Sequence, residues 1–253
     1  MWPVLLSFGP FKLYGYGAAI TLGAALSARL MWNCRVRAGL RDEESYWALI
    51  NIAALSGFVG GKILYLIQYG WSDLSIASGY SAFGGFVSVP LAIAAFARWK
   101  KVPFLNLIDH MFPIASFWHA FGRLGCFLAG CCQGRPTELP WGVVFRDPRS
   151  MLPPEFLGVR LHPVQLYEAA VDLAVSWLLF KIVAASEARR LKPGLAAAAY
   201  LACYGVTRFS LEFVRSDTLP FLGPLTQGQA LGLGLLAAAG ALLAWRSRCS
   251  PSC

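Results

Sequence analysis

Two arginines and two glutamates lie inside long apolar stretches of this sequence, at Arg123, Arg208, Glu168 and Glu212. An ionisable side chain in such a stretch usually faces a protein interior or a water-filled cavity, so it marks a site by default. A guanidinium group binds phosphate through two parallel hydrogen bonds, and few carboxylates are present to occupy both arginines. The pattern therefore predicts that Arg123 and Arg208 bind a phosphate group, for which a phospholipid is the natural source.

The alternative is that such charged groups only neutralise one another inside a helical bundle. Arg208 and Glu212 are four residues apart, so they share one face of a helix and are able to pair. His119 and Arg123 have the same spacing. Further ionisable groups in apolar stretches are Lys62, Asp109, His110 and Asp172.

Glycines recur beside these polar positions. The pairs are Gly60 with Gly61, Gly84 with Gly85, Gly122 with Gly125, and Gly130 with Gly134. Small residues allow helices to pack closely in membranes, which explains any one pair. Their recurrence next to charged residues favours a second interpretation, in which the backbone approaches a ligand.

Three of the seven cysteines, Cys126, Cys131 and Cys132, follow Arg123 closely in the chain. A disulfide requires a geometry in which Cys126 reaches Cys131 or Cys132. A metal site is disfavoured because the spacing C-x4-C-C is not the usual ligand spacing. A nucleophilic thiolate is the third interpretation, since the cation of Arg123 favours the charged form of a neighbouring thiol.

The elements that must position these residues are apolar helices. Of the 253 residues 57% are hydrophobic and only 14% are charged, and the mean hydropathy is +0.55. A bilayer core is crossed by roughly 20 apolar residues. Apolar stretches occur near residues 11–32, 46–68, 81–97, 105–130, 164–181, 195–214 and 221–245. We therefore predict an all-α fold, a polytopic membrane helical bundle with about seven transmembrane helices.

The distribution of basic residues predicts the orientation of this bundle. Arginine and lysine concentrate near residues 35–41, 98–101, 189–192 and 246–248, at alternate ends of the expected helices. Since basic loops stay in the cytoplasm, the N-terminus is expected outside and the C-terminus inside. The formal net charge of +9 then reflects cytoplasmic loops rather than nucleic-acid binding. We expect one membrane-embedded domain over residues 1–248, an external loop at 131–162 and a short cytoplasmic tail at 249–253.

Six ordered segments of the chain resemble the prolipoprotein diacylglyceryl transferase family. They are LYGYG at 13–17, GGKILYLIQY at 60–69, SAFGGF at 81–86, GRLGCFLAGCCQGRPTELPWGVVF at 122–145, HPVQLYE at 162–168 and YGVTRFSLEFVR at 204–215. HPVQLYE and GRLG are specific in combination, whereas the Gly-Gly pairs alone are weak signals. The resemblance extends over nearly the whole chain.

This resemblance implies a seven-span enzyme of the bacterial inner membrane, acting near the outer leaflet. Its implied reaction moves a diacylglyceryl group from phosphatidylglycerol to a cysteine thiol of an exported preprotein. Arg123 and Arg208 would hold the lipid phosphate, and Glu212 would orient an arginine or a substrate hydroxyl. The implied substrate-binding residues are Tyr14, Lys62, Gly84, Gly85, Gly134, Gln165, Glu168 and Tyr204.

The sequence departs from the family pattern at several positions of the expected site. Phe83 replaces the family histidine, Cys126 replaces an asparagine, and Cys131 replaces a glutamate. Because a phenyl ring carries no proton, His162 or His119 becomes the candidate base for the acceptor thiol. Cys126 and Cys131 become candidate catalytic residues.

The resemblance and these departures together leave three candidate functions. The first is the family reaction, and the second is a related transferase with another acceptor or with a covalent intermediate on a cysteine. The third is a phospholipid-binding membrane protein without turnover. No nucleotide, metal or flavin motif occurs in the sequence, so no cofactor is expected.

Overall fold

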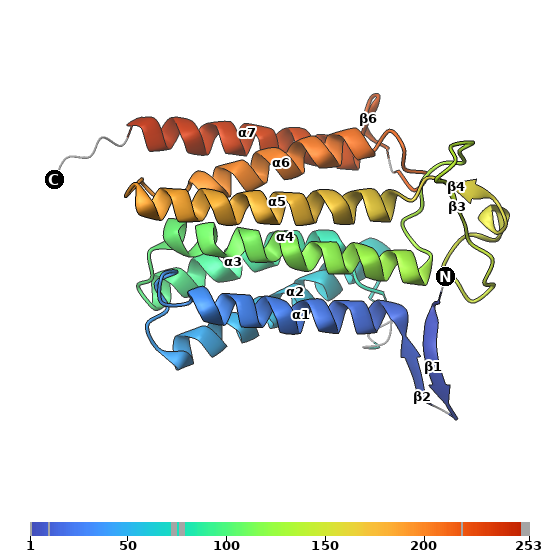
Figure 1. Ribbon diagram of the computed structural model, residues 1–253, viewed down its shortest axis with the longest axis horizontal. Helices are drawn as coiled ribbons and strands as arrows, with labels where there is room; N and C mark the ends of the chain where they lie inside the picture. Colours follow the sequence, from blue (N-terminus) through green and yellow to red (C-terminus); the bar gives the residue numbers. More distant parts are fainter. Residues whose placement is uncertain (1, 10, 72–74, 76–78, 219, 249–253) are drawn as a thin grey trace. The chain divides into compact units, whose positions relative to one another are not determined.

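The computed structural model describes residues 2–9, 11–71, 75, 79–218 and 220–248. The side chains of Ala82, Phe83 and Leu222, and the expected tail at 249–253, lie outside this description. The helices of the described chain are α1 (Gly15–Cys34), α2 (Glu43–Tyr69), α3 (Ala82–Trp99), α4 (Phe104–Ala129), α5 (Val164–Ala188), α6 (Leu195–Leu211) and α7 (Gln227–Arg248) (Figure 1). They coincide with the seven apolar stretches, which confirms the helical fold.

Three of these helices, α2, α5 and α7, are long and apolar enough to cross a membrane, while α6 and residues 84–99 of α3 are shorter apolar helices. Large apolar side chains on the helices face outward, including Leu55 at 63% exposed, Leu91 at 65% and Trp177 at 65%. Such exposure is explained by contact with lipid, whose tails are as apolar as these side chains. The chain is therefore a helical membrane protein.

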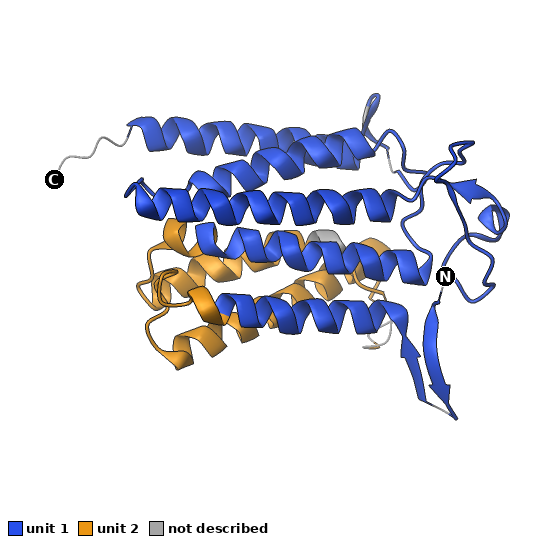
Figure 2. Cartoon of the chain, viewed as in Figure 1, with its two compact units in different colours: residues 1–31, 109–253 blue, residues 32–108 orange. Residues whose placement is uncertain are grey.

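Three small antiparallel sheets and a short helix complete the described structure. β1 (Val4–Phe8) pairs with β2 (Phe11–Tyr14), β3 (Val143–Val144) pairs with β4 (Arg160–Leu161), and β5 (Pro220–Leu222) pairs with β6 (Leu225–Thr226). The 3-10 helix η1 covers Pro154–Phe156. The chain divides into two compact units, residues 1–31 with 109–253 and residues 32–108 (Figure 2).

In the first unit, glycines let helices pack closely. A side chain at Gly23 of α1 would collide with Phe121 of α4, and Gly125 of α4 lies against Tyr16 of α1. Helices α4 and α5 are joined by hydrogen bonds, such as the one that the Ser116 hydroxyl donates to the Asp172 carbonyl at 2.8 Å. These contacts fix α1, α4 and α5 side by side.

Asp109, one of the charged residues singled out in an apolar stretch, has a structural role. Its carboxylate accepts hydrogen bonds from the backbone N–H groups of Gly194 at 2.6 Å and Ala197 at 2.8 Å. Those donors belong to the first turn of α6, where backbone N–H groups lack partners within the helix. Asp109 therefore caps α6 from α4 and fixes the position of α6 in the bundle.

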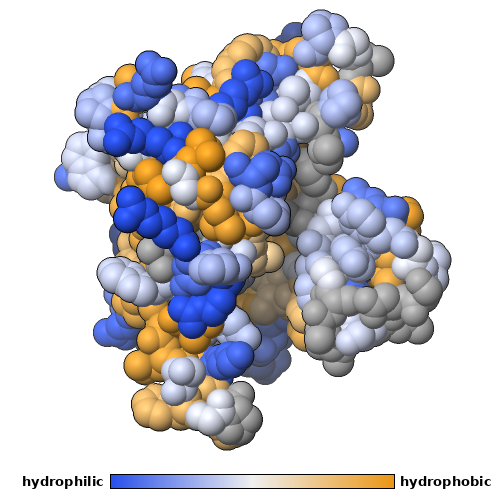
Figure 3. All heavy atoms as spheres, turned by 90° about the vertical axis from the view of Figure 1, so that its right-hand side faces the viewer, coloured by the Kyte–Doolittle hydropathy of each residue, from blue (hydrophilic) through white to orange (hydrophobic). Residues whose placement is uncertain are grey.

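The segment between α4 and α5, predicted as an external loop, has a small core of its own. Phe145, Leu152 and Leu161 are buried, with at most 5% of each side chain exposed. Leu161 of this core belongs to β4, which pairs with β3. This end of the molecule shows hydrophilic side chains interspersed with hydrophobic ones (Figure 3). The segment is thus a packed element that connects the C-terminal end of α4 to the N-terminal end of α5.

The second unit is built on α2 and α3. A side chain at Gly84 would collide with the backbone of Gly60, and Ser88 donates a hydrogen bond to the Ser56 carbonyl at 2.7 Å. Asp42 caps the start of α2, because its carboxylate accepts hydrogen bonds from the backbone and hydroxyl of Ser45. Those two hydrogen bonds lower the pKa of Asp42 below its ordinary value.

Candidate functional site

Glu168 of α5 is the centre of a buried cluster of arginines in the first unit. Its carboxylate forms an ion pair with Nε of Arg123 on α4. Its Oε1 atom lies 3.2 Å from Nη1 of Arg215 and 3.8 Å from Nη1 of Arg208. Only 5% of the Glu168 side chain is exposed. We call Glu168, Arg123, Arg208 and Arg215 the arginine cluster.

A second ion pair lies one helical turn away along the same two helices. His119 precedes Arg123 by four residues on α4, and Asp172 follows Glu168 by four residues on α5. Nδ1 of His119 lies 2.9 Å from Oδ2 of Asp172. Because α4 and α5 run antiparallel, the two pairs form successive rungs between them. The His119 ring also contacts the edge of Tyr204 on α6, with ring centroids 5.5 Å apart.

The third helix of the site, α6, contributes the predicted pair of Arg208 and Glu212. Nη2 of Arg208 lies 3.1 Å from Oε2 of Glu212, which confirms the pairing expected from their spacing. A side chain at Gly228, in the first turn of α7, would collide with the Glu212 carboxylate and lie 2.8 Å from Nη2 of Arg208. The absence of a side chain at Gly228 is what leaves room for this pair.

Arg215 closes the cluster from the segment after α6. Its guanidinium donates to Asp217 at 3.0 and 2.7 Å, and only 7% of its side chain is exposed. Burial opposes the charge of Arg215, but the carboxylates of Asp217 and Glu168 raise its pKa above the ordinary value. Arg215 is therefore a permanent cation at the edge of the site.

The arginine cluster has more donors than its carboxylates can accept. Each guanidinium carries five N–H groups, and three guanidiniums share the two oxygens of Glu168. Nη1 of Arg208 is buried and makes no hydrogen bond within the described part of the chain. Since a buried charged donor without a hydrogen bond is costly, a tetrahedral oxyanion such as phosphate is the ligand best suited to this nitrogen.

The three cysteines meet at the C-terminal end of α4. The sulfur atoms of Cys126, Cys131 and Cys132 all lie within 4.8 Å of one another, and all three residues are free thiols. Hydrogen bonds from Cys126 and Cys131, and the cations of Arg123 and Arg215, lower the pKa of Cys132. The hydrogen bonds to Cys126 and Cys132, together with burial, raise that of Cys131. Of the two cysteines after α4, Cys132 is therefore the more acidic thiol.

Other predicted site residues surround the cysteines and the cluster. Gln165, 1% exposed, donates a hydrogen bond to the Cys131 carbonyl at 2.8 Å. Gly134 forms an isolated β-bridge with Arg215, and a side chain there would collide with the backbone of His162. The ring of His162 lies beside Tyr167, with centroids 6.3 Å apart. The structure thus places Gln165, Glu168, Tyr204, Arg123 and Arg208 in one region of the first unit.

Tyr14 lies elsewhere in the same unit, at the end of β2 and 55% exposed. The described residues give it no hydrogen bond to the arginine cluster. Tyr16, two residues later, packs against Gly125 and lies within electrostatic range of Arg123 and Cys126.

Lys62, Gly84 and Gly85 belong to the second unit. The ammonium group of Lys62 donates to the Ser75 carbonyl at 2.7 Å and lies 5.3 and 5.4 Å from the ring centroids of Tyr65 and Tyr80. Gly84 is the point where α3 touches α2 at Gly60, which supports the helix-packing interpretation of that pair. Phe83, which replaces the family histidine, has its side chain outside the described residues.

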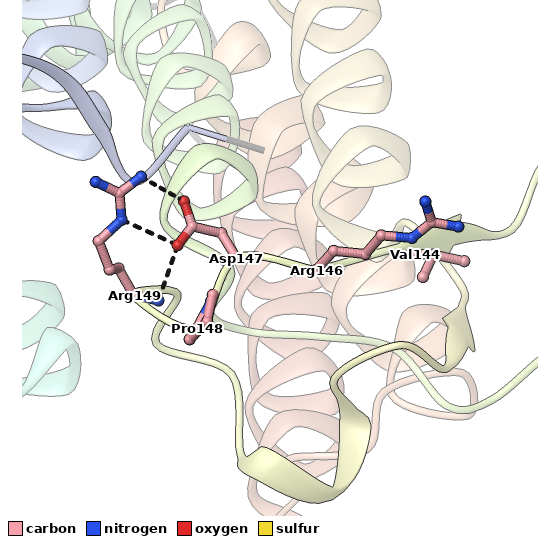
Figure 4. A pocket seen from close by; sticks show the side chains of 5 residues that line it. All are labelled: Val144, Arg146, Asp147, Pro148 and Arg149. Carbon is pink, nitrogen blue, oxygen red and sulfur yellow. Dashed lines mark hydrogen bonds and ion pairs between the residues drawn. The ribbon is translucent and has the colours of Figure 1, made fainter.

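An open hollow of about 850 Å³ lies on the segment after α4. It is lined by Val144, Arg146, Asp147, Pro148 and Arg149 (Figure 4). Arg149 and Asp147 bind each other through hydrogen bonds of 2.8 to 3.0 Å, which lower the pKa of Asp147 to about 2. Arg146 points away from this pair in Figure 4. Because the Asp147 carboxylate is already paired with Arg149, this hollow is a poor candidate for the active site.

Four residues of the site were missed by sequence reasoning: Arg215, Asp217, Tyr16 and Gly228. A signal existed for Arg215, because it ends the segment YGVTRFSLEFVR. Gly228 had no signal, since only the packing of α7 against α6 shows why a glycine is needed there.

Comparison with known proteins identifies relatives of the chain over almost its full length. A family model described as prolipoprotein diacylglyceryl transferase matches residues 3–245. A phosphatidylglycerol–prolipoprotein diacylglyceryl transferase of Clostridium tetani is 30% identical over 240 residues, covering 92% of this chain and 93% of the relative. The protein of the same name from Solidesulfovibrio magneticus is 34% identical over 264 residues, covering 97% and 94%. One from a Nostoc species is 34% identical, covering 96% and 88%.

Proposed function

This chain belongs to the prolipoprotein diacylglyceryl transferase family, and from that premise we propose that it moves a diacylglyceryl group from phosphatidylglycerol to a cysteine thiol of an exported protein. In this reaction the acceptor sulfur forms a bond to a glycerol carbon, and the bond from that carbon to the phosphate oxygen breaks. Glycerol phosphate leaves with the electron pair. The enzyme must therefore bind the phosphate, stabilise its developing charge and remove the proton of the thiol.

The observation that carries this proposal is the buried Nη1 atom of Arg208, which has no hydrogen bond among the described residues. Arg123 and Arg208 enter the site from different helices, and Glu168 holds both. Two guanidinium groups fixed in this way offer a phosphate several donors without reorganisation. Arg123 and Arg208 would bind the lipid phosphate, and Glu168 would position them.

Glu212 would position Arg208 from the side opposite Glu168. Its carboxylate is 2% exposed and lies 3.1 Å from Nη2 of Arg208. A carboxylate there keeps the guanidinium plane fixed, so that Nη1 remains directed to the ligand. Glu212 would orient Arg208 or accept a hydrogen bond from the glycerol headgroup.

The proton of the acceptor thiol requires a base, and His119 is the better placed of the two candidates. It lies one turn from Arg123, and Asp172 lies 2.9 Å from its Nδ1 atom. A carboxylate partner at Nδ1 favours the tautomer with the proton on that nitrogen and leaves Nε2 free to accept one. His162 contacts Tyr167 and lies beside Gly134, and it makes no ion pair with a carboxylate among the described residues. We assign the base to His119.

The location of the site at one end of the first unit supports an outward-facing active site. The C-terminal end of α4, the N-terminal end of α5 and the C-terminal end of α6 all meet there. The opposite end of the same helices carries Arg189, Arg190 and Lys192, and Arg246 of α7 donates to the Lys192 carbonyl at 2.5 Å. Basic residues favour the cytoplasm. We infer a seven-span chain in the bacterial inner membrane with the N-terminus outside, the C-terminus inside and the site at the outer leaflet.

An apolar groove on the first unit offers a surface for the lipid tails. Its volume is about 410 Å³, and it is lined by Leu26, Arg29, Leu30, Phe117, Leu173, Ser176, Trp177 and Phe180. These residues come from α1, α4 and α5, two of which also carry the arginine cluster. A lipid bound at the arginines would find an apolar surface on the same helices.

Reconstitution of the purified protein with phosphatidylglycerol and a peptide carrying the acceptor cysteine tests the proposal. We expect the peptide to gain the mass of one diacylglyceryl group. Lipid that copurifies with the protein but is never transferred to the peptide would instead identify a phospholipid-binding protein.

A transferase with a covalent cysteine intermediate is the second candidate, because Cys126 and Cys131 lie beside Cys132 in the field of Arg123. The sulfur of one cysteine would displace glycerol phosphate and then give up the diacylglyceryl group to the acceptor thiol. Mass spectrometry of the quenched enzyme would find the diacylglyceryl group on Cys126 or Cys131. Full transfer by Cys126→Ser, Cys131→Ser and Cys132→Ser variants would exclude this route.

A further inference from the structure

The turn after α4 brings three thiols together by an unusual backbone path. Gly130 has φ +77° and Cys132 has φ +58°, both in the left-handed region. The backbone N–H groups of Gly130 and Cys131 both donate to the Cys126 carbonyl, at 2.9 and 3.1 Å. A left-handed residue at the end of a helix reverses the chain, which carries Cys131 and Cys132 back to Cys126. A non-glycine residue at positive φ is costly, so Cys132 is held in place by its surroundings.

The segment that follows is tied to its neighbours on both sides. Gln165 of α5 donates to the Cys131 carbonyl at 2.8 Å, and the Gln133 carbonyl accepts from Ser216 at 3.2 and 3.1 Å. Arg135 donates its backbone N–H to the Val214 carbonyl at 2.8 Å. The backbone that carries Cys131 and Cys132 is therefore held by hydrogen bonds that do not involve the thiols.

The three sulfurs lie nearly as close together as those of a metal trithiolate. Metal-to-thiolate bonds are about 2.3 Å, so three sulfurs in a plane around one ion stand about 4 Å apart. In this protein the three lie within 4.8 Å of one another. Small side-chain rotations of Cys126, Cys131 and Cys132 would bring all three sulfurs into contact with one ion.

The number and type of ligands select the metal. Thiolates prefer soft ions such as Cu(I) and Zn(II). Zn(II) in a structural site takes four protein ligands, whereas Cu(I) is satisfied by three sulfurs in a plane. Three thiolates and one Cu(I) carry two negative charges, and the cations of Arg123 and Arg215 lie within electrostatic range of Cys132 to offset them.

We propose that Cys126, Cys131 and Cys132 form a binding site for one soft monovalent metal ion, with Cu(I) as the ion that fits. This proposal concerns metal binding alone and does not depend on the transferase function, although the site adjoins Arg123. Binding involves no change of oxidation state: the thiols release their protons to solvent, and three sulfur-to-copper bonds form. The linear spacing C-x4-C-C disfavoured a metal site, but the reversed turn at Gly130 and Cys132 supplies the convergence that spacing alone did not predict.

The test is anaerobic titration of the purified full-length protein with Cu(I) in the presence of a chromogenic Cu(I) chelator. We expect one ion per chain and, by X-ray absorption, a shell of three sulfur atoms at about 2.3 Å. Single Cys126→Ser, Cys131→Ser and Cys132→Ser variants should each weaken retention of Cu(I) at least about tenfold. Cys203→Ser, which removes a thiol of α6 outside the cluster, should leave it unchanged.

Three results would overturn the proposal. The first is loss of all Cu(I) from the wild-type protein to the chelator, and the second is equal retention of Cu(I) by a variant that lacks all three cysteines. The third is a disulfide between two of the three in protein purified without reductant, found by mass spectrometry after thiol alkylation. Thermal unfolding of each variant separates loss of the site from loss of the fold, and the sulfur shell of the wild type needs no variant.

Discussion

Arg123 of α4 and Glu168 of α5 form a buried ion pair, and this pair joins the two helices at the level of the site. Glu168 also contacts two further arginines, so a single carboxylate sets the position of three guanidinium groups. One turn away, His119 and Asp172 repeat the arrangement with a histidine in place of an arginine. In our proposal, phosphate binding and proton removal therefore lie on adjacent turns of one helix, α4.

Replacement of Glu168 by glutamine is expected to damage both stability and activity. The side chain keeps its size but loses its charge, and three buried or half-buried cations lose a shared partner. Breaking a buried ion pair typically costs about 3–5 kcal/mol. We expect a lower midpoint of thermal unfolding in detergent and transfer reduced at least about tenfold. Glu155→Gln, a change at an exposed position in η1, is the control; an unaltered Glu168→Gln enzyme would contradict the role of Glu168.

Arg208→Lys tests whether the planar guanidinium matters beyond its charge. Lysine keeps the cation but cannot contact Glu212 and a phosphate through two fixed nitrogens. A hydrogen bond to a charged group contributes about 1.5–3 kcal/mol, so we expect binding of phosphatidylglycerol to weaken about tenfold or more. Isothermal titration with short-chain phosphatidylglycerol measures this. The control is Arg149→Lys, whose side chain is 65% exposed and which should bind phosphatidylglycerol as the wild type does. If the two variants bind phosphatidylglycerol equally well, Arg208 does not bind its phosphate.

Gly228→Ala should reduce transfer because the new methyl group collides with the Glu212 carboxylate and approaches Arg208. Overpacking of this kind costs about 1–3 kcal/mol. Here we expect the clash to displace the Glu212 carboxylate and so disturb its ion pair with Arg208. Gly234→Ala is a matched control on the same helix, since its added methyl group meets no atom within 4 Å. Both changes replace a glycine of α7 by a better helix former. Initial rates of transfer should fall for Gly228→Ala alone; equal rates would show that the pair tolerates the methyl group.

His119→Gln should lower the rate of transfer about 100-fold or more without loss of lipid binding, because general base catalysis contributes about 10²–10⁴-fold. His162→Gln should have a smaller effect. The comparison of kcat with lipid affinity for the two variants checks the assignment. A larger loss of kcat in His162→Gln than in His119→Gln would move the base to His162.

Much of the helical fold followed from hydropathy alone. The apolar stretches near 46–68 and 195–214 became α2 and α6, with ends shifted by a few residues. The pairing of Arg208 with Glu212 was also predictable, because it depends only on the helical repeat. The crossing of the chain between inside and outside at all seven helices stays a prediction.

Contacts between helices were not predictable in the same way. His119 and Arg123 share a helix face, but each pairs with a carboxylate of α5 rather than with its neighbour. The partner of each depends on the rotation of α4 and α5 about their axes, which packing decides. The meeting of Cys126 with Cys132 likewise depends on a left-handed turn that no local composition rule indicated.

The most direct test of the transferase proposal uses cells depleted of their own diacylglyceryl transferase. The protein is expressed there, and the mass of a lipoprotein acceptor cysteine is followed by mass spectrometry. We predict a gain of one diacylglyceryl group with the wild-type protein and none with Arg123→Ala or Arg208→Ala, each at wild-type abundance in the membrane. No gain with the wild-type protein, or an equal gain with both variants, would contradict the claim that this arginine cluster serves diacylglyceryl transfer.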